Sequence, residues 1–328
     1  MASGLGHDCY LQIGREATWS SPVASSRRFN IVNGTMMGER AKVRTDALTA
    51  FRNRSAIYAG PQIGRANFSL EADYEGQLHL WDAVLGTATF GANGMTSSGA
   101  GPYTWTGIQR NLFSSYTLQL ITNVPSGKCD RMAGAKLNKF TLGGSTGFDA
   151  KPLKMDLEFV GASVVTNVSP TGALSANSAL PIMMHHVDTG AFKAGTADTA
   201  GTERLRSFEL SITNGLAEYF YGADTIQEPV ADEFATTQLK WTIEFGSATA
   251  IDEYVANTQG APIIKFAAPT GTKSLQISMP KGYIVAPVGR PVDRYGILTQ
   301  EFTYEAIHDS GTVSGVAITI INAESTIS

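Results

Sequence analysis

The sequence predicts a mainly β protein with two tandem sandwich or barrel modules, each carrying a short flanking α-helix. Three observations support this fold class. Strand-like alternation of apolar and polar residues recurs along the chain between glycine and proline punctuation. A strand followed at once by a short helix occurs twice, at residues 66–86 and 237–257. The 328 residues include 43% hydrophobic ones, which is enough to bury a core in each of two domains of ordinary size.

The first of these units begins as a half-buried strand and ends as an amphipathic helix. Its first apolar residues follow the period of two that places alternate side chains on one face, at Phe68, Leu70, Ala72 and Tyr74. Its next apolar residues recur at helical spacing, at Leu78, Trp81, Val84 and Leu85. We therefore expect a strand over residues 66–74 and a helix over residues 78–85.

The second unit repeats this arrangement. Its strand positions are Leu239, Trp241, Ile243 and Phe245. Its helical positions are Ile251, Tyr254 and Val255. We expect a strand over residues 237–245 and a helix over residues 251–255.

The neighbouring segments repeat in the same order, which favours a duplicated module over two independent occurrences of a common pattern. Further strands are predicted near residues 27–34, 115–122, 135–144, 152–161, 205–213, 273–280 and 295–307. Asn33-Gly34 and Asn214-Gly215 are typical turn residues, and each precedes a long polar segment. We place the first module at residues 1–165 and the second at 201–328. Residues 166–200, rich in small polar residues, are expected to be a linker or exposed connection.

Charge and cysteine content restrict the classes of function. The net charge of −4 gives no overall basic field for nucleic acid or anionic lipid. The first residues lack the pattern of a signal peptide, and no apolar run has the length of a membrane span. We therefore expect synthesis in the cytoplasm and no membrane partner. Cys9 and Cys129 lack metal-site spacing and are predicted to be free thiols, with a disulfide between them as the alternative.

Residues suited to catalysis or metal binding are sparse. His185 and His186 are adjacent, so on an extended chain they point to opposite faces, and Asp188 adds one candidate ligand without a third at a recognised spacing. Neither a nucleophile elbow nor a phosphate-binding loop occurs. Asp156 and Glu158 have the residue types of an acid–base pair, but a solvated strand face is their more ordinary role. We expect no enzyme activity and no cofactor.

Three segments carry a resemblance to a known family. They are "YAGPQIGRANFSLEADYEGQLHLWDAVLG" at residues 58–86, "KLNKFTLGGSTGFDAKPLKMDLEFVGASV" at 136–164 and "PVDRYGILTQEFTYEAI" at 291–307. The first resembles the module core, and the others the closing strands of the two modules, of major tail tube proteins of long-tailed bacteriophages with noncontractile tails. The resemblance spans residues 10–307 and rests on pattern and spacing.

The resemblance implies a structural virion protein with two tail-tube-like modules. In that family sandwich modules join edge to edge into a ring with one inner barrel, and rings stack into the tube through which the genome passes. Two modules per chain imply a ring of three chains with pseudo-sixfold symmetry, with six chains as the alternative. A tape measure protein and tail-end proteins are further implied partners, and genomic DNA is expected to pass without specific binding. A virion or cell-surface decoration protein with two binding sandwiches is the competing interpretation, and a carbohydrate-acting enzyme is a remote one.

A channel lining follows from this resemblance. If the apolar strand faces pack beneath the barrel wall, the opposite faces line the lumen, where Lys154 and Lys240 are the minority. The lumen-facing candidates are acidic: Glu71, Asp73, Asp156, Glu158, Glu244, Glu301 and Glu305. Such a surface repels DNA phosphates and lets the duplex slide. The alternative is that these residues face outer solvent.

Two long polar segments of opposite charge are predicted to meet between rings. Residues 34–60 supply the basic candidates Arg40, Lys42, Arg44, Arg52 and Arg54. Residues 215–235 supply the acidic candidates Glu218, Asp224, Glu228, Asp232 and Glu233. Complementary charges steer association and fix its register, so we expect the basic segment of one chain to contact the acidic segment of a neighbouring chain in the adjacent ring. The alternative is that both segments are merely solvated.

Overall fold

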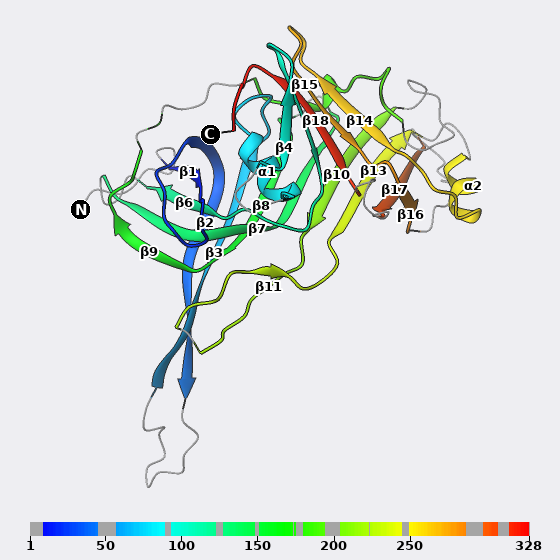
Figure 1. Ribbon diagram of the computed structural model, residues 1–328. Helices are drawn as coiled ribbons and strands as arrows, with labels where there is room; N and C mark the ends of the chain where they lie inside the picture. The colour runs from blue at the N-terminus through cyan, green and yellow to red at the C-terminus, as the bar shows by residue number, and fades with distance from the viewer. Residues whose placement is uncertain are drawn as a thin grey trace.

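The computed structural model is mainly β, with two short α-helices in its described part, which confirms the predicted fold class (Figure 1). It describes residues 9–44, 57–88, 93–122, 127–147, 151–172, 174, 180–193, 204–222, 224–244, 249–286, 298–307 and 315–327.

The elements follow one another in the order that the sequence suggests, with several strands added. The first half contains β1 (Tyr10–Arg15), β2 (Arg27–Arg44), β3 (Ile57–Glu71), α1 (Leu78–Leu85), β4 (Met95–Ser98), β5 (Tyr103–Ile108), β6 (Tyr116–Ile121), β7 (Cys129–Ser145), β8 (Lys154–Gly161) and β9 (Ser163–Val168). The rest of the chain contains the short 3-10 helix η2 (Met184–His186), β10 (Leu205–Thr213), β11 (Leu216–Ala217), β12 (Val230–Ala231), β13 (Thr236–Glu244), α2 (Thr249–Val255), β14 (Ile263–Ala267), β15 (Ser274–Ser278), β16 (Gly282–Ile284), β17 (Thr299–Ala306) and β18 (Ala317–Asn322).

The alternating segments form strands because one of their faces is buried. In β8 the residues Met155, Leu157 and Phe159 are buried, while the intervening polar residues keep contact with solvent. The same alternation holds in β13, where Leu239 and Trp241 are buried. Burial of every second side chain is what a period of two predicts. The predicted apolar faces of these two strands are therefore confirmed at the described residues, and Phe245 lies outside them.

The predicted helices are present, whereas one predicted turn is not. α1 has the predicted bounds, and α2 begins slightly earlier than predicted. Asn33-Gly34 was expected to end a strand, but it lies inside β2, which pairs with β3 as far as Arg44. Gly34 lies opposite Phe68, and a Cβ at this position would collide with the Phe68 ring. The glycine therefore permits a close approach between strands rather than a turn.

Strands from both halves form one large antiparallel sheet. Its order is β2-β3-β8-β7-β10-β13-β17-β16, and β1 and β6 connect β2 to β7 on the other side, so that six strands of the first half close into a barrel. A second sheet has the order β14-β15-β18-β5-β4 and combines strands from both halves, because β5 pairs with β18 near the C-terminus. The two halves therefore share sheets as well as a core.

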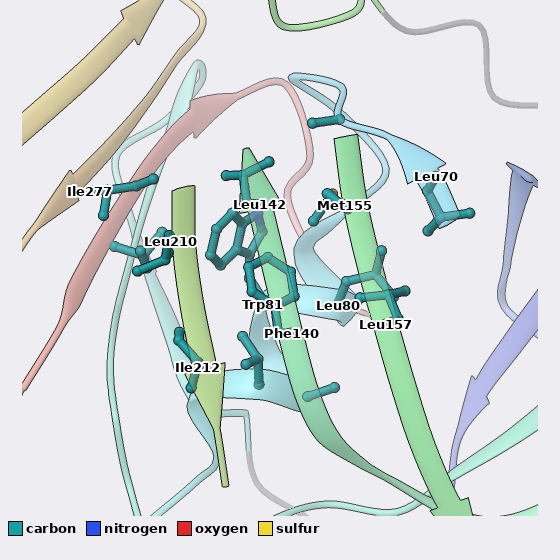
Figure 2. Packing of buried hydrophobic residues seen from close by; sticks show 14 of the residues in the cluster. Leu70, Leu80, Trp81, Phe140, Leu142, Met155, Leu157, Leu210, Ile212 and Ile277 are labelled. Carbon is teal, nitrogen blue, oxygen red and sulfur yellow. The ribbon is translucent and has the colours of Figure 1, made fainter. Parts of the chain in front are cut away.

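The core lies between these layers and includes the whole of α1. Every residue of α1 is buried, and the helix contacts β7 of the large sheet and β4 and β5 of the second sheet. Trp81 of α1 packs on Phe140 of β7 with ring centroids 4.9 Å apart, and Figure 2 shows side chains of β7, β8 and β10 converging on it. Burial of such large aromatic side chains is a main source of stability.

Part of the expected linker also belongs to the core. Ile182, Met184 and Phe192 are buried. The backbone of Ile182 donates to the carbonyl of Ala72 at 2.7 Å and accepts from the amide of Leu153 at 2.8 Å. Val187 forms a bridge with Phe266 of β14, so residues 180–193 contact elements of both halves and are partly buried.

Candidate functional site

The large sheet contains two similar four-strand units joined edge to edge. The order β2-β3-β8-β7 is followed directly by the order β10-β13-β17-β16. In each unit the second strand precedes a helix, and a long stretch of sequence separates the first two strands. The units join through β7 and β10, which pair from Lys139 opposite Thr213 to Ser145 opposite Ser207.

One face of this sheet is polar across both units. Opposite the apolar core face, the paired residues of neighbouring strands form a continuous polar row, made up of Ser69, Asp156, Thr141, Ser211, Gln238 and Glu305. The row crosses the joint between β7 and β10 without interruption. We call this surface the polar face.

Most of the lumen-facing candidates lie on the polar face. Their strands alternate between these residues and buried ones, and the candidates on this face are Glu71, Asp156, Glu158, Glu244, Glu301 and Glu305. Lys154 lies 3.0 Å from Asp156, and Lys240 lies 2.9 Å from Glu301. These exposed ion pairs each contribute little stability. The surface thus combines a majority of carboxylates with a few paired lysines.

Two of the candidates differ from the rest in their surroundings. Asp73 lies beyond the end of β3, in a bridge with Pro181, and burial together with the nearby Glu71 carboxylate raises the pKa of Asp73 to about 7. Glu244 accepts from Arg206 and lies 3.6 Å from Arg204. Asp73 is therefore only partly ionised near neutral pH, and the charge of Glu244 is balanced by arginines.

The polar face also contains charged residues that the sequence argument missed. Glu209 lies between buried Phe208 and Leu210, so the alternation of β10 contains the signal that would have found it. Lys139 lies opposite Glu158, but a bulge between Leu137 and Lys139 interrupts the alternation of β7.

The basic candidates lie on a long hairpin rather than in a loop. β2 continues to Arg44 and β3 begins at Ile57, so Arg40, Lys42 and Arg44 are strand residues. Arg52 and Arg54 lie outside the described residues. β2 and β3 together project well beyond the body of the protein (Figure 1), and we call their described residues, 27–44 and 57–71, the β2–β3 hairpin.

Several acidic candidates have partners within the same chain. Glu218 lies 2.9 Å from Arg65, and Glu228 lies 2.7 Å from Lys136. Asp224 lies 3.9 Å from the Arg40 guanidinium. Lys136 is almost fully buried, and its burial lowers its pKa, whereas Glu228 opposes this shift. The β10–β13 excursion (residues 214–235) therefore folds back onto the base of the β2–β3 hairpin, while Asp232 and Glu233 lie exposed near its end.

The adjacent histidines His185 and His186 lie in different surroundings. His185 is exposed, and the Nδ1 of buried His186 lies 3.1 Å from the Tyr74 hydroxyl. Burial and the neighbouring His185 lower the pKa of His186. Asp188 lies 3.2 Å from Lys265. Within the described ranges, no group of three or more His, Cys, Asp or Glu residues is arranged to hold a metal ion.

The remaining features considered in the sequence are the two cysteines and a membrane span. Cys9 and Cys129 are free thiols, and burial raises the pKa of Cys129. None of the helices that the structure describes is long and apolar enough to cross a membrane.

The fold and the polar face define a structural protein that presents an extended β-sheet with one polar surface. The chain belongs to the phage tail tube protein family, which it matches over residues 6–306. Comparison with curated proteins finds no match. As a member of this family, the protein is a non-enzymatic structural component of the virion tail and assembles with itself into a tube. This membership favours the tube interpretation over a decoration protein.

Proposed function

We propose that three chains form each ring of the tube and that each chain supplies two of six wall segments. The observation that carries this proposal is the joint between β7 and β10, where two units with the same strand order pair edge to edge within one chain. Repeating the same joint between chains closes a ring, in which the two kinds of unit alternate with pseudo-sixfold symmetry.

The joint between chains is formed by β2 of one chain and β16 of the next. β16 is the last strand at its end of the large sheet, and beyond Asn30, where the pairing with β1 stops, β2 pairs only with β3 among the described strands. By strand register, Thr35 of β2 holds in the first unit the position that Ser211 of β10 holds in the second. Val285, just after β16, holds in the second unit the position that Thr141 of β7 holds in the first. Because Ser211 lies opposite Thr141, Thr35 of one chain would lie opposite Val285 of its neighbour. Closure in this register removes exposed strand edges.

The polar face lines the channel of this ring. The opposite face of the sheet is covered by the core and α1, so the polar face is the surface left for the lumen. Its carboxylates outnumber its lysines, which weakens attraction to DNA phosphates, so the genome passes without being held.

The two oppositely charged segments leave the same end of the sheet. One polar row marks this end and consists of Thr35, Asn67, Glu158, Lys139, Thr213 and Thr236. Both the β2–β3 hairpin and the β10–β13 excursion extend beyond it. In rings stacked head to tail, opposite ends of the sheet face each other across each junction. Two segments at the same end therefore meet more readily within one ring than between adjacent rings. We therefore assign stacking to the projecting hairpin with its arginines, which reaches the facing end of the adjacent ring.

Electron microscopy of the purified protein tests these proposals. We expect tubes whose averaged map has threefold symmetry with two alternating units, and six identical chains around the axis would refute the three-chain ring. The resemblance of the sequence supports a long noncontractile tail, with a tape measure protein and tail-end proteins as partners. A contractile sheath around the tube in micrographs of virions would contradict that assignment.

A further inference from the structure

Two apolar side chains are exposed at the end of the second unit where the excursions leave. Phe234, just before β13, is 101% exposed, and Ile307, just after β17, is 46% exposed. Single exposed apolar side chains are ordinary on a protein surface, but these two differ from their covered counterparts in the first unit. We call these two residues the Phe234–Ile307 patch.

The corresponding residues of the first unit are buried. The number of residues from Phe234 to the start of α2 equals the number from Ile63 to the start of α1. Arg65, two residues after Ile63, lies opposite Val160. The register of β13 and β17, extended by two residues beyond the pair of Gln238 and Glu305, likewise brings Thr236, two residues after Phe234, level with Ile307. Phe234 and Ile307 are thus the counterparts of Ile63 and Val160.

The β10–β13 excursion covers the first-unit pair. Ile226 is fully buried in a small cluster with Ile63 and Val160. Two backbone hydrogen bonds hold it there: the Gln62 amide donates to the Asp224 carbonyl at 2.7 Å, and the Ile226 amide donates to the Gln62 carbonyl at 3.3 Å. The first unit is therefore covered by the excursion of the unit that adjoins it at β7.

We propose that the Phe234–Ile307 patch binds the β2–β3 hairpin of a second copy of this chain in the same ring. This inference rests on the proposed ring, in which β2 of the second copy adjoins β16. The hairpin of that copy then leaves the sheet beside β17 and β13, just as the β10–β13 excursion leaves it beside β8 and β3. The part of the hairpin next to the sheet occupies on the second unit the place that the excursion occupies on the first, and the part that projects farther reaches the adjacent ring.

Charge and apolar surface on the two partners fit this contact. Asp232 and Glu233 are exposed directly before Phe234. The hairpin supplies Lys42, which is exposed, and Met37, an apolar side chain that is 46% exposed. Opposite charges around an apolar centre orient association, while the apolar contact supplies most of its strength.

Photo-crosslinking from position 234 identifies the occupant. Benzoylphenylalanine replaces Phe234 in the full chain, and assembly uses a mixture of isotopically light and heavy chains. We expect crosslinks between chains to peptides from residues 27–71. The same label at Val255, which is 77% exposed on α2, serves as the control and should give no crosslink to the hairpin. Crosslinks from position 234 to its own chain, or to another surface, would overturn the inference.

The variant Phe234→Ser measures the contribution of the contact. Because Phe234 is exposed in the single chain, the variant should keep the unfolding midpoint of the wild-type chain. Association of chains into rings should weaken about ten- to hundredfold, as expected for loss of one buried aromatic contact. The matched variant Val255→Ser should leave association unchanged.

The outcomes separate this inference from the proposed ring. Unchanged ring formation by Phe234→Ser, or intact rings that no longer stack, would overturn the assignment of the patch to a contact within the ring. If the wild-type protein forms threefold tubes while the crosslinks map elsewhere, the inference alone fails. If the wild-type protein forms no ring, both the proposed ring and the inference fail.

Discussion

Truncation of Ile226 to alanine is expected to release the β10–β13 excursion from the first unit. Ile226 is fully buried, but its cluster is small and contains Ile63 and Val160 as its other buried members. Removing a buried isoleucine to alanine costs about 2–5 kcal/mol, and a small cluster that can collapse places the cost near about 2–3 kcal/mol. The loss should appear mainly as local opening, because the main core is a separate cluster.

Hydrogen exchange at two amides reports this opening directly. The amides of Gln62 and Ile226 donate the hydrogen bonds that join the excursion to β3. A local cost of about 2–3 kcal/mol corresponds to exchange that is about 30- to 150-fold faster at these amides. The conservative variant Ile226→Val costs about 0.5–1.5 kcal/mol and should accelerate exchange by a smaller factor.

Exchange at the Gln62 amide distinguishes a local from a global role of Ile226. If exchange of the Gln62 amide is unchanged while the global unfolding free energy falls, Ile226 stabilises the core in general and does not hold the excursion. The covered first unit would then be a poor guide to the second unit.

Further variants test separate parts of the structure. Gly34→Ala should lower the free energy of unfolding, measured by urea denaturation, by about 1–3 kcal/mol, because the added Cβ collides with Phe68. Gly147→Ala is the control and should leave this free energy unchanged, because nothing lies within 4 Å of its added Cβ. Asp73→Asn should stabilise the protein above pH 7 and have little effect near pH 4. The pKa of Asp73 is about 7 in the native state and ordinarily 3.8, so the native state binds more protons than the unfolded state between these pH values. The native state therefore loses stability as the pH rises through this range. Denaturant titrations at several pH values measure this loss. Glu158→Lys should leave tubes assembled but make them retain DNA in a salt-dependent manner, and tubes that bind no more DNA than wild type would argue against a lumenal polar face.

The sequence by itself determined the local elements and the faces of the main strands. Alternation in β8 and β13 identified which side chains are buried, because a strand in a layered fold must bury one face. The helical spacing after β3 gave the bounds of α1, but the burial of all its residues, in place of the predicted amphipathic face, depends on the layers on both sides. Those periodicities are local, so they can be read without knowing the neighbours of a strand.

The tertiary structure decided which strands become neighbours. Pairing of β5 with β18 and of β7 with β10 depends on residues far apart in the chain, and no local period encodes it. The bulge that places Lys139 on the polar face is likewise defined by its partner strand. Asn33-Gly34 is typical of a turn in the sequence, but the fold places it in β2 opposite Phe68. The exposure of Phe234 is likewise a property of the fold. Contact between distant segments sets these features, which is why the edges and patches available for assembly emerge only from the folded sheet.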